Sequence, residues 1–150
     1  MTRLGSAFKN SDALRLKTFE LGGQIFRVRI PLTKEMDAIE ARINNVDEAE
    51  EQRRYEKMVA GFGNIDMEGV IKTEDDVIVE GRSTRDMVRG ILKMENRVVE
   101  FIKLLVPADG TLDDITYEEI DAEWPFTVQL DILAKIGEVI APGYKEERKN

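Results

Sequence analysis

The sequence contains neither cysteine nor histidine. Without cysteine the chain has no disulfide, thiolate nucleophile or thiolate metal ligand. Without histidine it lacks the commonest general base and metal-binding side chain, and a Ser-His-Asp triad is excluded. It also has no phosphate-binding glycine loop and no nucleophile elbow. The sequence therefore predicts a protein that is not an enzyme and holds no cofactor.

Proline and long apolar runs are also scarce. The chain has 4 prolines in 150 residues, and no stretch approaches the roughly 18 apolar residues of a membrane span. A hydrophobic fraction of 42% and a charged fraction of 35% are typical of a globular protein with much solvated surface. We therefore expect a single domain over residues 1–150, with flexible ends at 1–13 and 144–150.

The charge is unevenly distributed along the chain. The net charge is −8, yet residues 1–34 carry seven basic and two acidic side chains, whereas residues 105–140 carry nine acidic and one basic. An acidic chain is a poor nucleic-acid ligand, because binding depends on neutralising phosphates. The separation of charge favours head-to-tail self-association or a charged protein partner. The alternative is an acidic face that serves only solubility.

Apolar periodicity predicts an α+β fold that is mostly helical. Alternating residues on both sides of Gly22-Gly23 indicate an N-terminal β-hairpin, in which Phe26 and Val28 share one face. Short strands are expected at 70–71 and 77–79. Helical spacing follows over 33–62 and 84–105, and Ser83 with Asp86 has the spacing of a cap before the second of these segments. Thr116 and Glu119 have the same T-x-x-E type of spacing before a short helix, and a last helix is expected from Pro125 to near Ala141. We expect the hairpin to pack on three to four helices.

The segment 84–105 has the clearest helical pattern. Its apolar residues are spaced 4, 3, 4, 3 and 4 apart, which predicts a seam for helix packing: Met87, Ile91, Met94, Val98, Phe101 and Leu105. A basic series repeats at every fourth position: Arg85, Arg89, Lys93 and Arg97. Because like charges at this spacing repel, we expect acidic residues of the same chain or of a second copy to compensate them.

The densest negative charge precedes the most apolar helix. Seven acids and no base lie between 109 and 123: Asp109, Asp113, Asp114, Glu118, Glu119, Asp121 and Glu123. The following helix carries Phe126, Leu130 and Leu133 on one row, with further apolar residues beside it, and so wide a face needs about two neighbours. Either this is the central helix of a small core, or part of it binds a partner.

The partner-binding interpretation defines a candidate surface. Trp124, at the junction, is either an aromatic anchor or a core residue. The candidate partner-binding residues are Trp124, Phe126, Leu130, Leu133, Met87, Met94, Phe101, Arg85, Arg89, Lys93 and Arg97.

Residues 64–75 loosely follow the pattern of a calcium-binding loop. Asn64, Asp66 and Glu68 supply oxygen ligands, but Asp75 replaces the usual final glutamate, and Gly61 and Gly63 interrupt the preceding helix. An acidic loop or hairpin is the favoured interpretation, and we expect no metal site. Paired carboxylates elsewhere lie in polar turns, which do not provide the cleft of a hydrolase.

The order of these segments resembles a known family. The hairpin in "FELGGQIFRVRIP" leads into a charged helix, and "ITYEEIDAEWPF" later precedes an amphipathic C-terminal helix. Together they resemble the tail assembly chaperones of long-tailed bacteriophages, over residues 16–145.

The resemblance implies a non-enzymatic protein of the infected host cytoplasm. Such a protein binds the tape measure protein, keeps it soluble and recruits the tail tube protein. It is expected to form a homo-oligomer and to bind neither nucleic acid nor membrane. The alternative is a structural virion component, such as a neck or tail-completion protein.

Overall fold

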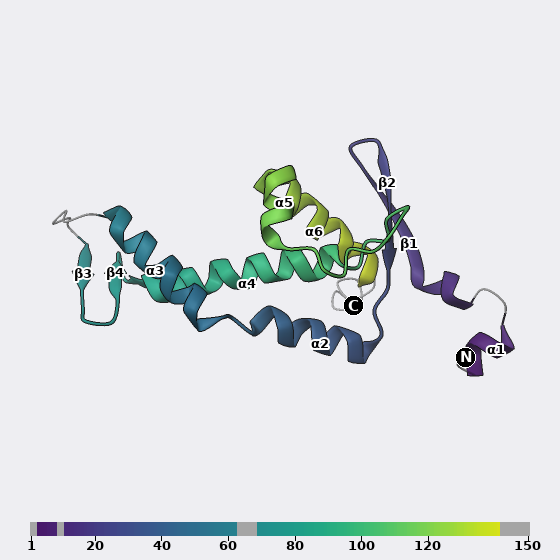
Figure 1. Ribbon diagram of the computed structural model, residues 1–150, viewed down its shortest axis with the longest axis horizontal. Helices are drawn as coiled ribbons and strands as arrows, with labels where there is room; N and C mark the ends of the chain where they lie inside the picture. The colour runs from purple at the N-terminus through teal and green to yellow at the C-terminus, as the bar shows by residue number, and fades with distance from the viewer. Residues whose placement is uncertain (1–2, 9–10, 63–68, 142–150) are drawn as a thin grey trace, which may run out of the picture. The chain divides into compact units, whose positions relative to one another are not determined.

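The computed structural model describes residues 3–8, 11–62 and 69–141. Figure 1 shows the order of the elements along the chain. The helices are α1 (Arg3–Ala7), the 3-10 helix η1 (Ser11–Arg15), α2 (Thr33–Asn44), α3 (Glu48–Phe62), α4 (Thr84–Ile102), α5 (Tyr117–Glu123) and α6 (Phe126–Ile140). The strands are β1 (Leu16–Leu21), β2 (Gln24–Arg29), β3 (Val70–Lys72), β4 (Val77–Val79) and β5 (Arg82–Ser83). These elements confirm the predicted α+β, mostly helical class.

The chain forms two compact units. The first contains residues 1–40 and 98–150, and the second contains residues 41–97. The single domain expected over 1–150 stays a prediction. Within the expected flexible arm, the structure forms α1, which buries none of its residues, and the start of η1. The expected flexible tail, 144–150, lies outside the described residues.

The hairpin of the first unit closes at the predicted two-glycine turn. Strands β1 and β2 are antiparallel, and Leu21 faces Gln24 across the turn. Gly22 and Gly23 have φ values of 63° and 79°, a left-handed conformation that a type I′ turn requires at both positions. The turn residues therefore set the register of the hairpin.

The two faces of the hairpin have different surroundings, as the alternation predicted. The rings of Phe19 and Phe26 stack with their centroids 5.1 Å apart, and Val28 on the same face is fully buried. Arg27 and Arg29 on the other face are exposed. Helix α6 contacts β1, so the hairpin packs on a helix within this unit.

The outer edge of β2 pairs with the segment that follows α4. The Arg29 N–H donates to the Leu104 carbonyl at 2.9 Å, and the Val106 N–H donates to the Arg27 carbonyl at 2.9 Å. These bonds fix the segment 104–113 beside the hairpin. The buried apolar residues of the first unit are Val28, Ile39, Val98, Phe101, Ile102, Leu104, Leu105, Ile120, Ile132 and Ile136.

The second unit is built on the pairing of α3 with the N-terminal part of α4. Tyr55, Val88 and Leu92 form a buried cluster, against which Val46, Met58 and Val59 pack. Arg54 on α3 donates to both carboxylate oxygens of Glu95 on α4, at 3.1 and 2.9 Å. The predicted short strands are confirmed as β3 and β4, which form a three-stranded sheet with β5.

The start of α4 is held by two oxygen-bearing side chains. Ser83 Oγ accepts the Asp86 N–H at 3.2 Å, which confirms the predicted cap. Asp76 Oδ1 accepts the N–H groups of Val77 and Arg85 at 2.7 and 3.1 Å, and Ser83 Oγ donates to Oδ2. Burial opposes ionisation of Asp76, but these hydrogen bonds outweigh it and lower its pKa.

Replacing Asp76 by asparagine is expected to weaken this end of α4 in a pH-dependent way. Because folding lowers the pKa of Asp76, its stabilising contribution is complete above the unfolded pKa of about 3.9 and is lost as the pH falls through the folded value. We expect Asp76→Asn to lower the free energy of unfolding by about 1 kcal/mol at pH 7, with the difference shrinking below about pH 4.

Urea unfolding between pH 7 and pH 3 measures this difference. The matched control is Asp75→Asn, which removes the same charge from an exposed neighbour in the same turn. Equal destabilisation by the two variants at every pH would contradict a specific cap.

Candidate partner-binding surface

The junction between α5 and α6 is a two-residue break at Trp124-Pro125. Thr116 begins α5, because its Oγ1 accepts the Glu119 N–H at 3.3 Å, as the T-x-x-E spacing predicted. A proline disfavours helical backbone in the residue before it. Trp124 accordingly has φ −121° and ψ 121°, so α5 ends there and α6 begins at Phe126.

A buried amide holds the two helices together across this break. Gln129 has 0% exposure. Its Nε2 donates to the Trp124 carbonyl at 2.9 Å and to Asp121 Oδ1 at 3.2 Å, while its Oε1 accepts the Tyr117 hydroxyl at 3.0 Å. The sequence pattern did not predict this role. The spacing of Gln129 could have indicated it. Gln129 lies three and seven positions before Ile132 and Ile136, which are buried on the same side of α6.

The predicted apolar row of α6 lies beside the buried row and is largely uncovered. Phe126 is 52% exposed and Leu130 is 37% exposed, while Leu133 is half-buried. These three residues are four and three positions apart, so they share one side of the helix. Trp124 at the junction is also half-buried. The first unit therefore covers one apolar row of α6 and leaves the outer end of the next row open to solvent.

The seven carboxylates that precede α6 are all exposed. None of the seven forms an ion pair in the described part of the chain. Figure 1 shows α5, which carries the last four of them, against α6. Glu118 and Glu119 lie in the first turn of α5, where negative charge favours the helix dipole. Helix α5 therefore brings four exposed carboxylates to the helix that carries the open apolar row.

The predicted seam of α4 is only partly buried. Met87 and Met94 are 39% and 37% exposed, whereas Phe101 is 7% exposed. Phe101 was expected to bind a partner, and the structure corrects this because its ring is in the core. In the N-terminal part of α4 the buried apolar residues are Val88 and Leu92, one position along from the predicted seam, because Tyr55 packs there.

The basic series of α4 contacts α3 within the second unit. The Arg85 guanidinium lies over the Tyr55 ring at 3.9 Å from its centroid and donates to Gln52 Oε1 at 3.0 Å. Arg89 pairs with Glu51 at 3.1 Å, and this carboxylate raises the pKa of the guanidinium.

Acidic residues of the same chain or of a second copy were expected to compensate the basic series. At Arg89 the compensating acid belongs to the same chain, since it is Glu51 of α3. Arg85 and Arg89 thus have structural contacts of their own, while Lys93 and Arg97 are half-buried.

Comparisons of the chain with protein-family models, with curated proteins and with solved structures found no match.

The expected calcium-loop ligands Asn64, Asp66 and Glu68 lie outside the described residues. The chain after Asp75, the last position of the loop, forms β4 in place of the second helix that a calcium-binding loop requires. In the part of the chain that the structure describes, no three acidic side chains are grouped as a metal site. No helix there combines the length and the hydropathy needed to cross a bilayer.

The hydrogen bonds of Gln129 can be tested by its replacement with leucine. The variant leaves the Tyr117 hydroxyl and the Trp124 carbonyl without these bonds in a buried setting, so we expect the free energy of unfolding to fall by about 1–3 kcal/mol. Chemical denaturation measures the loss, and Gln24→Leu, at an exposed glutamine, is the control.

A double-mutant cycle with Tyr117→Phe should give a coupling energy of about 1 kcal/mol. Additive effects of the two substitutions would contradict the hydrogen bond between these side chains.

Proposed function

We propose that this protein is a non-enzymatic tail assembly chaperone of a long-tailed bacteriophage, acting in the cytoplasm of the infected cell. It binds the tape measure protein and promotes assembly of the tail tube around it. The observation that supports this proposal most is the open apolar row of α6, together with the exposed carboxylates of α5, which packs against the same helix.

The row on α6 has the chemistry needed to hold a helical client. An amphipathic helix packs its apolar residues against a row of side chains spaced three and four apart. Full burial of a large apolar side chain contributes roughly 1.5–3 kcal/mol, and Phe126 and Leu130 still have much of their surface to bury. The adjacent carboxylates keep the surface hydrated and disfavour acidic partners.

A second exposed row supports the same interpretation. Met87, Ile91 and Met94 are exposed on α4. Methionine adapts to varied apolar partners because it is unbranched and flexible, which suits a client without one fixed contact sequence. A long helical client offers binding sites to many copies, so the proposal includes self-association and contact with the tail tube protein.

Capture of the tape measure protein should depend on the open row of α6. We expect Phe126→Ser combined with Leu130→Ser to weaken capture at least about tenfold, because the two exposed side chains are the anchors of the contact. Co-purification of the co-expressed tape measure protein measures this loss. The control is Ile25→Ser on the hairpin, which removes an apolar side chain that is 69% exposed. Unchanged capture by the α6 double variant would contradict the proposed surface.

Purified virions provide an independent test. A chaperone leaves the assembled tail, so mass spectrometry of intact particles should not detect the protein, although it is abundant in the infected cell. Detection in fixed copy number would instead support the structural virion component.

A further inference from the structure

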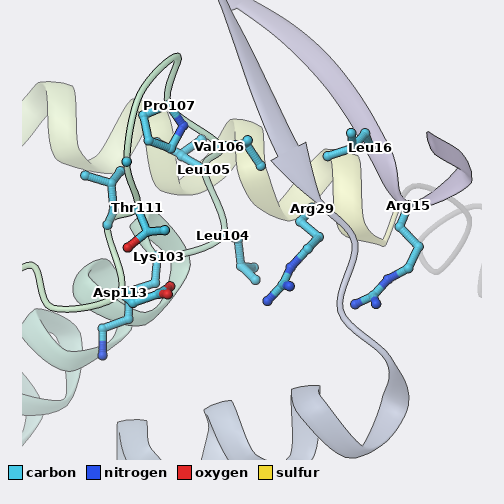
Figure 2. A pocket seen from close by; sticks show the side chains of 12 residues that line it. Arg15, Leu16, Arg29, Lys103, Leu104, Leu105, Val106, Pro107, Thr111 and Asp113 are labelled. Carbon is cyan, nitrogen blue, oxygen red and sulfur yellow. The ribbon is translucent and has the colours of Figure 1, made fainter. Parts of the chain in front are cut away.

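The first unit contains a pocket at the open end of the hairpin. Its volume is about 440 Å³, within the range of sites that hold small ligands or a few side chains. The hairpin and the segment 103–113 form its walls, as Figure 2 shows. The residues that line it include Arg15, Leu16, Arg29, Lys103, Leu104 and Leu112.

Two of the three basic side chains in this pocket already have hydrogen-bond partners. Arg15 Nε donates to the Ile30 carbonyl at 3.1 Å, and its Nη2 donates to Glu35 Oε1 at 2.6 Å. Lys103 donates to Glu100 at 3.0 Å.

Arg29 differs from these two residues. Its guanidinium lies 3.7 Å from Glu35 Oε2 and forms no hydrogen bond with any described residue. The Leu32 N–H, with Arg15 and Arg29, lowers the pKa of Glu35, so this carboxylate stays charged. Because the guanidinium has five N–H donors and none of them forms a hydrogen bond with Glu35, Arg29 retains donors for a second carboxylate.

The opposite end of the pocket has mixed polarity. Figure 2 shows Lys103 and Asp113 on the side away from Arg15 and Arg29. Asp113 disfavours a carboxylate at that end. A plain hydrocarbon tail is also disfavoured there, because it would cover Asp113, Lys103 and the polar backbone without replacing their bonds to water. Peptide groups can supply both donors and acceptors at this end.

We propose that this pocket binds an acidic peptide segment of a partner protein, in which a carboxylate pairs with Arg29 and the next apolar side chain packs on Leu104 and Leu112. The guanidinium can bind the carboxylate with two parallel hydrogen bonds. The site is separate from the open row of α6, since none of that row lines the pocket. The protein therefore has one surface for an apolar helix and another for an acidic chain.

Fluorescence anisotropy of the full-length protein with a labelled octapeptide of alternating glutamate and leucine tests this site. We expect saturable binding that weakens about tenfold in Arg29→Gln, since a charge-assisted bidentate contact is lost. The matched control is Arg27→Gln, which removes the same charge from the same face of β2. Arg27 does not line the pocket, and its contact with the pocket wall is a 3.4 Å hydrogen bond to the Pro107 carbonyl. It should change the dissociation constant less than about twofold, and circular dichroism should show the fold unchanged in both variants.

Three results would overturn the proposal. Equal weakening by Arg29→Gln and Arg27→Gln would show a general charge effect. Equal binding of a peptide with glutamine in place of each glutamate would exclude recognition of a carboxylate. Competition by octanoate as strong as that of the unlabelled peptide would assign the pocket to small organic acids. The Phe126→Ser, Leu130→Ser variant should bind the octapeptide normally, so failure of this site and failure of client capture are separable.

Discussion

The buried amide of Gln129 determines how the acidic and apolar parts of the chain meet. In a continuous helix, Tyr117 and Gln129 would be about 18 Å apart along the axis. The Tyr117 hydroxyl instead lies 3.0 Å from Gln129 Oε1. The chain must therefore turn back at Trp124-Pro125, and the amide holds that turn by bonding α5 and the junction together. This places the carboxylates of α5 against the helix that carries the open apolar row.

The two units use their charged side chains differently. In the second unit, arginines of α3 and α4 bind carboxylates on the facing helix, as with Arg54 and Glu95. Partly buried pairs of this kind orient the two helices more than they stabilise them. In the first unit, the seven carboxylates around α5 form no such pair among the described residues. These carboxylates are therefore available to an approaching partner, which supports the proposal that the first unit contributes to partner selection.

The sequence predicted the elements whose signals are local. The glycine pair specified the hairpin turn, and the hydroxyls of Ser83 and Thr116 specified where α4 and α5 begin. The sequence did not predict which apolar row of α4 is buried. Spacing shows which residues share a side of the helix, but it does not show which element packs against that side. Phe101 and Met94 belong to one row, yet only Phe101 is in the core.

Contacts between residues that are distant in sequence could not be predicted either. One example is the pocket that Arg29 forms with the segment 103–113.

Helices α4 and α6 share a property that the core alone does not explain. Each carries apolar side chains in two adjacent rows, and only part of them is buried. A helix with one covered side is stable with polar residues at the remaining positions, and exposed apolar rows carry a risk of aggregation. Retaining Phe126 and Leu130 beside a dense negative segment is consistent with selection for contact rather than for folding, because the carboxylates limit unspecific association while the row stays accessible.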